Sequence, residues 1–539
     1  MPLFPPLSTS RAALIGALQS AQQQSQVFDL LVIGGGATGL GVALDAACRG
    51  LKVVLVEGHD FAKGTSSRST KLVHGGVRYL AQGNIALVRE ALHERSTLLA
   101  NAPHIAQPLA FVVPAYQWWE SAFYGLGLKM YDALAGRAGL GSTRFLSSSE
   151  TQKALPTVRS NGLRGGVQYW DGQFNDAQLA IALARTAARE GALMLNHMKA
   201  ASLRFTEGQV SGVVCEDVLT GQSHVIQARC VVNATGVWVD ALRAQDGQSQ
   251  HMVAPSQGVH IVVDAKFMPG QQALMIPKTA DGRVLFAVPW LGKVILGTTD
   301  TPREDLAMEP LAFEEEVDFI LREAARYLQG PPQRSDVKSI WVGLRPLVKP
   351  PDDEGSNTKG LSREHTVLVS PSGLVTVTGG KWTTYRAMAE DVLTHCADRG
   401  LLPRQASPTV HFPLVGAEPT TTAPRPLSAA PGLHSYGSEQ EWVAKLPGHD
   451  VKLTEGLTEA MVRFAARCEF AVHVEDVLAR RSRLLFLDAA LAVHLAEEVG
   501  RILFEETGLD PDVAGFVKLA AQYQLEGACQ AKDRPTDGL

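Results

Sequence analysis

The sequence predicts an α/β fold built around a buried parallel sheet, and three stretches of the chain indicate it. Residues 29–33 are a short β-branched, apolar run that leads into a GxGxxG motif at residues 34–39 and then into a helical pattern. Residues 51–56 and 230–233 are two further apolar runs of this kind. Strands that are apolar on both faces and alternate with helices are typical of a sheet covered by helices.

The glycine motif predicts a dinucleotide-binding loop rather than an ordinary glycine turn. Gly34 allows the tight turn, Gly36 lets the backbone approach a pyrophosphate, and Gly39 lets the helix pack closely on the strand. The phosphates would lie at the helix N-terminus, where unpaired N–H groups and the helix dipole favour anions. Glu57, at the end of the second strand, is placed to accept hydrogen bonds from an adenosine ribose. The cofactor-binding residues predicted here are Gly34, Gly35, Gly36, Ala37, Thr38, Gly39 and Glu57.

Composition and charge exclude several classes of function. Charged residues make up 19% of the 539 residues and the formal net charge is -5, so no basic field favours a nucleic-acid partner. The six cysteines are scattered, without a CxxC pair or histidines at metal spacing, which indicates a reducing compartment and predicts no metal site. No apolar run reaches the length of a membrane span. Residues 1–27 are expected to be a flexible leader, with a transit peptide as the weaker alternative.

A polar loop follows the second strand. Hydroxyls, glycines and cations beside a nucleotide fold suit a phosphate and flavin-edge cradle, although a solvated loop explains this segment alone equally well. The pattern GTSSxSxKLxHGGxRYL at residues 64–80 resembles the FAD-dependent glycerol-3-phosphate dehydrogenases, which are quinone-linked flavoproteins of the amino-acid-oxidase-like superfamily. Arg68 replaces a small residue of that family, so its role stays open. The cofactor-binding residues predicted here are Thr65, Ser66, Ser67, Lys71, His74, Gly75 and Gly76.

The resemblance implies a two-dinucleotide-binding FAD fold that other elements interrupt. The apolar strand that enters Ala234-Thr235-Gly236 is how such flavoproteins return to the nucleotide, and the hairpin-rich residues 257–300 predict an antiparallel sheet over the flavin. The expected organisation is a leader (1–27), a discontinuous FAD domain within 28–412 (28–100, 165–250 and 365–412), a substrate domain (101–164 and 251–364), an extended, exposed linker (413–436), a helical domain (437–528) and a tail (529–539).

A second glycine turn supplies the most specific match to the family. The segment Gly379-Gly380-Lys381-Trp382-Thr383 enters a helix, so its N–H groups can face an anion. In a flavoprotein the natural target is the N1–C2=O edge of the isoalloxazine, which gains negative charge on reduction. These five residues, together with Ala234, Thr235 and Gly236, complete the predicted FAD site.

The resemblance implies oxidation of sn-glycerol 3-phosphate to dihydroxyacetone phosphate, with FAD reduced and then reoxidised by ubiquinone. A dianionic phosphate needs several converging cations, and Arg78, Arg363 and Lys381 are the candidates. Arg345 is predicted to lie nearer the C2 hydroxyl, where a fixed positive charge stabilises developing alkoxide. His260 is the predicted base, because its unperturbed pKa lies near the operating pH. Tyr79 is a further substrate-binding candidate that orients the substrate.

Two alternatives to this function stay open. Glycerol-3-phosphate oxidases share the motifs but pass electrons to oxygen and release peroxide. A protein of another class, which binds a flavin or a partner without turnover, would leave a bound flavin unbleached by the substrate.

Two segments bear on partners. Trp118-Trp119 and the aromatic, cationic segment up to Arg137 suit either an interfacial membrane anchor or a buried amphipathic helix, and the resemblance favours the membrane. The expected location is the cytoplasmic face of a bacterial inner membrane, as a peripheral homodimer.

The cluster Arg480, Arg481 and Arg483 is expected to be a solvated face, with contact to lipid or to a dimer mate as the alternative. Residues 476–503 read as continuously helical.

Overall fold

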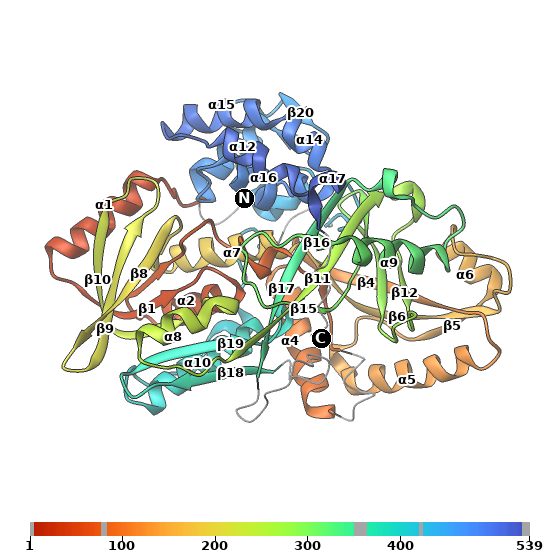
Figure 1. Cartoon of the computed structure of the whole chain (residues 1–539), viewed down its shortest axis with the longest axis horizontal. Helices are drawn as coiled ribbons and strands as arrows, with labels where there is room; N and C mark the ends of the chain where they lie inside the picture. Colours follow the sequence, from red (N-terminus) through yellow and green to blue (C-terminus); the bar gives the residue numbers. More distant parts are fainter. Residues whose placement is uncertain (1–4, 77–83, 350–363, 420–423, 531–539) are drawn as a thin grey trace, which may run out of the picture.

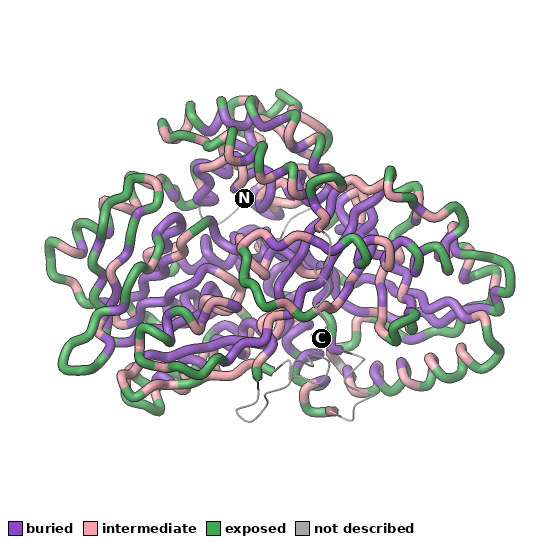
Figure 2. The backbone as a smooth tube through the Cα atoms, in the orientation of Figure 1, coloured by how far each residue is buried: buried purple, intermediate pink, exposed green. Residues whose placement is uncertain are grey.

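Two sheets lie next to each other, and a group of C-terminal helices lies beside both (Figure 1). The computed structural model describes residues 5–76, 84–349, 364–419 and 424–530. The buried part of the chain runs through both sheets and the inner sides of the helices around them (Figure 2).

The first sheet has eight strands, and its centre is parallel as predicted. Its main path runs β18-β19-β10-β1-β2-β7, in which only the edge strand β18 is antiparallel to its neighbour. The antiparallel pair β8 and β9 continues from the first half of β10. The strands are β1 (Val27–Ile33), β2 (Val53–Val56), β7 (Leu193–Leu195), β8 (Met198–Thr206), β9 (Gln209–Asp217), β10 (Ser223–Asn233), β18 (His365–Val369) and β19 (Leu374–Gly379).

Both faces of this sheet are buried, which explains the apolar strand sequences. Leu30 and Val32 of β1 pack toward the helices α2, α7 and α10, whereas Leu31 and Ile33 pack toward the opposite face. Successive strand side chains point to opposite faces, so an unbroken apolar run requires cover on both. The helices are α2 (Ala37–Cys48), α7 (Asp176–Arg189), α10 (Tyr385–Asp398) and the short α8 (Val239–Gln245).

The expected flexible leader is wrong for the residues that the structure describes. Residues Arg11–Gln23 form the helix α1, which Ser10 caps by accepting a hydrogen bond from the Ala13 N–H. Leu18 and Ala21 are buried against the outer face of the first sheet. This part of the chain is therefore a helix that packs on the sheet through one side.

The second sheet has ten strands and is antiparallel except where β12 pairs with β4. Its path runs β15-β11-β14-β13-β12-β4-β6-β3, with β17 paired to β11 and β5 to β6. The strands are β3 (Leu72–Val73), β4 (Ala106–Ala115), β5 (Arg144–Ser147), β6 (Gly165–Phe174), β11 (Val253–Asp264), β12 (Ala273–Ile276), β13 (Leu285–Trp290), β14 (Lys293–Gly297), β15 (Thr301–Pro302) and β17 (Ser339–Val348). Around it lie α4 (Ile85–Asn101), α5 (Glu120–Ala135), α6 (Ser148–Ala154) and α9 (Glu314–Ala325).

The sequence-based boundary between the two sheets is wrong at two places. β3 and β6 fall inside segments assigned to the FAD domain, yet both belong to the second sheet. β6 pairs with β4 along all ten of its residues. Pairing between strands distant in sequence depends on tertiary packing, which local patterns do not report.

The C-terminal part is helical, but two expectations about it are wrong. The segment 476–503 is broken into short pieces, with Arg483 in the left-handed conformation at φ 65°. The expected exposed linker is partly packed, because Leu414 and Leu427 are buried and the Leu427 carbonyl accepts from the Leu291 N–H. The elements are α11 (Gln440–Val443), α12 (Glu459–Cys468), the π-turn η10 (Asp476–Arg481), α13 (Leu484–Leu487), α14 (Ala489–His494), α15 (Ala496–Thr507), α16 (Val513–Ala521), α17 (Leu525–Ala528) and the strand pairs β20 (Lys452–Thr454) with β21 (Leu457–Thr458) and β16 (Ala312–Phe313) with β22 (Cys529–Gln530).

In the described ranges, no helix combines the length and the apolar character that crossing a bilayer requires.

Candidate functional site

A cavity of about 370 Å³ lies where the carboxyl ends of the first sheet's strands meet the face of the second sheet. Ligands of open α/β sheets bind at this edge of the strands. Most of the predicted cofactor residues line it, namely Gly36, Ala37, Thr38, Thr65, Ser66, His74, Gly76, Ala234, Gly236, Gly379, Gly380, Lys381, Trp382 and Thr383.

The glycine motif has the close packing that its spacing predicts. A Cβ at Gly39 would lie 1.9 Å from the Gly34 carbonyl oxygen, so only glycine lets α2 approach the strand. Gly34 has φ 112°, and a Cβ there would lie 2.5 Å from the Ala234 carbonyl oxygen. The Ala37 N–H, at the start of α2, faces the cavity and donates to Ser66 Oγ at 2.9 Å.

The substitution Gly39→Ala is expected to remove most of the bound flavin from the purified protein. Its methyl group meets backbone that can move only with the whole loop, and overpacking of this kind costs about 1–3 kcal/mol. The measurement is the flavin-to-protein absorbance ratio. Gly127→Ala is the control, because its Cβ meets nothing within 4 Å. A full flavin content in Gly39→Ala would contradict the assigned role of this glycine.

Glu57 lies at the end of β2 and holds the glycine loop. Its Oε2 accepts from the Gly35 N–H at 2.7 Å, and its Oε1 accepts from the His59 N–H at 2.9 Å. Burial raises the pKa of Glu57, and these two hydrogen bonds act in the opposite direction. The carboxylate is therefore fixed at the edge of the nucleotide loop, where the sequence predicts a ribose contact.

Lys71 was predicted to bind the cofactor, but its side chain points away from the cavity. Its Nζ lies 2.7 Å from Asp176 and 2.8 Å from the Ser67 carbonyl oxygen, and the side chain is fully buried. The ammonium also lies 5.1 Å from the centre of the Trp341 ring. Burial lowers the pKa of Lys71 to about 7, against the pull of Asp176. Seven other predicted cofactor residues also do not line the cavity, namely Gly34, Gly35, Gly39, Glu57, Ser67, Gly75 and Thr235.

Asp176 is the first residue of helix α7, but it does not cap the helix. Asn175 is the N-cap, while Asp176 turns toward the polar loop. It accepts from the Ser69 N–H at 3.1 Å, from Ser69 Oγ at 2.8 Å and from Lys71. Asp176 thus holds the residues on both sides of Thr70, so that Thr70 faces the cavity.

His260 lies on β11 inside the cavity wall, as the resemblance implies. Its Nε2 is 2.9 Å from Thr70 Oγ1, and its ring stacks on Trp341 with centroids 5.2 Å apart. Nδ1 is buried without a hydrogen-bond partner among the described residues. Burial, with the charges of Lys71 and Arg345, holds the pKa of His260 well below its usual value, so the imidazole is neutral near pH 7.

Arg345 lies on β17, next to β11, and its guanidinium borders the same cavity. Nη1 lies 3.1 Å from Asp300 Oδ1, and Nη2 donates to the Thr299 carbonyl at 2.8 Å. Gly258 leaves room for it, because a Cβ there would lie 2.3 Å from Nη2. The structure therefore brings a fixed cation and a neutral imidazole to one wall of one cavity.

The second glycine turn forms the opposite side. Gly379 and Gly380 have φ 83° and 77°, conformations that favour glycine. Trp382 Nε1, in the 3-10 turn Trp382–Thr384, donates to the Ser66 carbonyl at 2.8 Å. This bond joins the two predicted cofactor loops, and Lys381 of the second loop lines the cavity.

Three predicted substrate-binding residues cannot be placed in the cavity, and four apolar residues that line it were not predicted. Arg78, Tyr79 and Arg363 lie outside the described residues. Sequence reasoning missed the apolar end of the cavity, because its residues come from separate strands and carry no local motif. This end is lined by Phe111, Tyr169, Met275 and Phe286.

The arginine cluster is neither solvated nor a lipid contact. Arg480 and Arg481 both bind Asp60, which follows β2, and Arg483 donates to the Ser67 carbonyl at 2.7 Å. All three side chains are buried. They join the helical part to the nucleotide-binding part. The sequence shows the three arginines without their distant partners, so the cluster has the pattern of a solvent-exposed charged face.

Comparisons with known proteins agree with this architecture. A model of the FAD dependent oxidoreductase family matches residues 29–386, and a model of the C-terminal domain of alpha-glycerophosphate oxidase matches residues 407–514. Human mitochondrial glycerol-3-phosphate dehydrogenase is 42% identical over 96% of this chain and 74% of its own length. A mitochondrial glycerol-3-phosphate dehydrogenase of Arabidopsis thaliana is 41% identical over 93% of this chain and 86% of its own.

A solved structure agrees over nearly the whole chain. Glycerol-3-phosphate dehydrogenase from Bacillus halodurans complexed with FAD has a TM-score of 0.75 and 30% identity, and the match covers 97% of this chain and 99% of that one. These matches confirm the predicted fold class, an FAD-binding α/β fold with an antiparallel substrate sheet and a C-terminal helical domain.

Proposed function

Because the chain belongs to the family of FAD-dependent glycerol-3-phosphate dehydrogenases, we propose that it oxidises sn-glycerol 3-phosphate to dihydroxyacetone phosphate. The observation that carries this proposal is that His260 and Arg345 line the same cavity as the two glycine loops. A neutral base next to a fixed cation is what removal of a hydroxyl proton requires.

FAD is the cofactor, and the cavity fits it. The open N-terminus of α2 can receive the pyrophosphate, and Gly36 leaves the backbone accessible there. The turn at Gly379 and Gly380 can receive the pyrimidine edge of the flavin. When bound, FAD supplies the hydride acceptor.

The roles of the protein's own residues follow from their chemistry. Nε2 of His260, which lies next to Thr70, takes the proton from the C2 hydroxyl. Arg345 stabilises negative charge as it develops on that oxygen. Lys381 contributes to the cationic site for the phosphate, which Arg78 and Arg363 complete in this proposal.

The test is an anaerobic titration of the purified holoenzyme with sn-glycerol 3-phosphate. The visible flavin band is expected to bleach at about one substrate per chain, since each two-electron oxidation reduces one flavin. Glycerol serves as the matched control, because it lacks the phosphate that the cations bind. A band that persists with the phosphate ester would overturn the proposed substrate.

We propose a membrane quinone as the electron acceptor, with oxygen as the second candidate. Oxygen is retained as a candidate because residues 407–514 match a domain named for alpha-glycerophosphate oxidase. The reduced enzyme should regain its flavin band at least about 100-fold faster with ubiquinone than with oxygen, a barrier difference of about 2.7 kcal/mol. Faster recovery with oxygen, together with stoichiometric peroxide, would identify an oxidase.

Helix α5 supports peripheral contact with a membrane surface. Its inner side buries Leu128 and Tyr131, while Phe123 is 65% exposed and Leu126 66% exposed on the outer side. Trp118, just before the helix, is 80% exposed. Large exposed apolar side chains gathered at one site mark a contact surface, and tryptophan prefers the lipid–water interface. The location at a bacterial inner membrane and the homodimer stay predictions.

The combined substitution Trp118→Ser, Phe123→Ser and Leu126→Ser is expected to weaken binding to phospholipid vesicles by at least about tenfold, because each large apolar side chain contributes about 1.5–3 kcal/mol when fully buried. Co-sedimentation of the holoenzyme measures this. The control is Phe205→Ser with Val218→Ser, which removes one exposed apolar side chain from β8 and one that directly follows β9. Equal vesicle binding by both variants would argue against α5 as the contact.

A further inference from the structure

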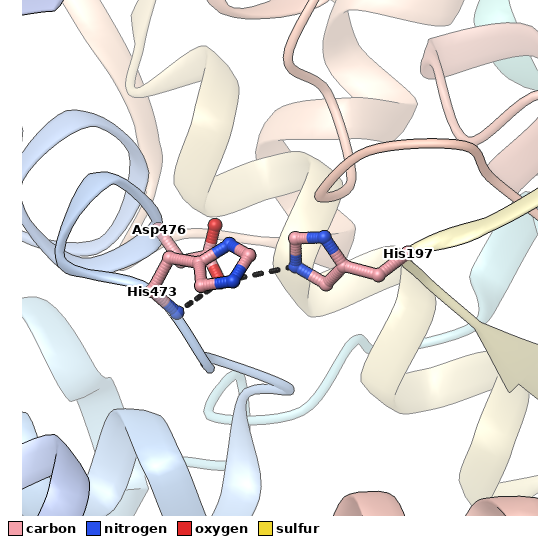
Figure 3. Close-up of side chains that lie close together, drawn as sticks. All are labelled: His197, His473 and Asp476. Atoms are coloured by element: carbon pink, nitrogen blue, oxygen red, sulfur yellow. Dashed lines mark hydrogen bonds and ion pairs between the residues drawn. The ribbon is translucent and has the colours of Figure 1, made fainter. Parts of the chain in front are cut away.

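His197, His473 and Asp476 lie together where the helical part meets the nucleotide-binding part (Figure 3). His197 comes from the turn between β7 and β8, His473 from the segment between α12 and η10, and Asp476 is the first residue of η10. Their potential ligand atoms all lie within 4.8 Å of one another. None of these residues belongs to the cavity described above.

We propose that these three residues bind a divalent metal ion of the zinc class. Two imidazole nitrogens and one carboxylate oxygen are a ligand set that Zn²⁺ accepts, with a fourth position left for water. His197 Nε2 lies 3.2 Å from Asp476 Oδ2. A tetrahedral ion with bonds of about 2.0–2.1 Å places neighbouring ligand atoms about 3.3 Å apart. The observed separation is therefore close to one edge of such a site.

The ligand side chains are held in place by their surroundings. Asp476 Oδ2 accepts from the Val472 N–H at 2.8 Å and from the His473 N–H at 2.9 Å, and Oδ1 accepts from Arg480 at 2.9 Å. Hydrogen bonds to a ligating carboxylate orient it toward the metal. The His197 N–H donates to the His59 carbonyl at 2.7 Å, and His197 has φ 49°.

A simple ion pair between His197 and Asp476 is the rival explanation. That pair needs only a proton on His197 and gives the ring of His473 no part. In the structure the His473 ring lies with its centroid 4.7 Å from that of His197, at an interplanar angle of 74°. His473 is also half-buried, which leaves an approach from solvent for an ion. The role of His473 therefore distinguishes the two explanations.

The charge of Arg480 does not exclude a cation. Its guanidinium is shared among Asp60, Glu475 and Asp476. Arg481 also pairs with Asp60 and Lys63 with Glu475, so three carboxylates face three cations and the cluster carries no excess positive charge. An ion held by His197 on one side and by His473 and Asp476 on the other would join the two parts of the molecule. Binding to the folded chain alone raises its thermal stability.

The test uses the holoenzyme after removal of metals with a chelator, followed by titration with Zn²⁺ alone. For the wild type we expect about one bound Zn²⁺ per chain and a higher unfolding temperature. The same two quantities are measured in the His473→Gln variant. Replacing a metal ligand should weaken Zn²⁺ binding by at least about tenfold. Replacing a residue that only hydrogen-bonds to a ligand already weakens metal binding by about 10- to 100-fold. His449→Gln is the control, since His449 is an exposed histidine near the same helices.

Each outcome decides between the explanations. Tight binding in the wild type and in His449→Gln, with weak binding in His473→Gln, supports the metal site. No stoichiometric Zn²⁺ in the wild type, or equal binding in His473→Gln, overturns it. Retained flavin absorbance in each variant shows that a loss of Zn²⁺ is not a loss of fold.

Discussion

The substitution His260→Ala is expected to lower kcat by about 100- to 10,000-fold, the range that a positioned general base contributes. KM should change little, because the proposed site assigns the phosphate to residues other than His260. The stacked, buried imidazole beside Thr70 belongs to a side chain whose usual pKa lies near neutrality. Steady-state kinetics with saturating quinone measure both constants.

The pH profile separates a base from a merely structural histidine. Burial, Lys71 and Arg345 lower the pKa of His260, so its imidazole stays deprotonated well below pH 6.5. A base is active when deprotonated, and therefore the acidic limb of kcat/KM should fall below pH 6.5 and disappear in His260→Ala. His449→Ala is the control and should match the wild type. Unchanged turnover of His260→Ala at saturating substrate would rule out the base role.

The parts of the molecule that follow from local chemistry could be predicted from the sequence. Gly34 and Gly379 need glycine because their φ angles are positive, and Gly39 needs glycine because a Cβ would clash with the Gly34 carbonyl oxygen. The alternation of buried residues along β1 likewise follows from cover on both faces. The positive φ at Gly34 and Gly379, the contact between Gly39 and Gly34, and the order of apolar residues along β1 can be read from short stretches of sequence, although the groups that surround them come from distant parts of the chain.

The parts that depend on distant partners could not be predicted. Lys71 was assigned to the cofactor because it lies in a polar loop, but Asp176 draws it into the core behind Thr70. Arg480 was assigned to the surface because its carboxylate partner, Asp60, is remote in the chain. Burying a charge is costly unless it is paired, and a sequence shows the charge without the pair.

Arg345 offers the second large effect. Replacing it with alanine is expected to lower kcat/KM by about 100- to 1,000-fold, as removal of one group that stabilises an oxyanion does. Its guanidinium is held from two sides, by Asp300 and by the Thr299 carbonyl, so that its charge is fixed before the substrate arrives. Fixed charge is more effective than mobile charge, because no reorganisation is needed when the alkoxide forms.

The conservative substitution Arg345→Lys separates the contribution of the charge from that of the guanidinium geometry. A lysine keeps the charge but has no planar fork, so it cannot hold Asp300 and Thr299 while also facing the substrate. We expect Arg345→Lys to recover only part of the activity lost in Arg345→Ala, with the gain in kcat rather than in KM. If both variants raised KM and left kcat unchanged, Arg345 would be a binding group for the phosphate, and the stabilisation of the alkoxide would have to come from elsewhere in the cavity.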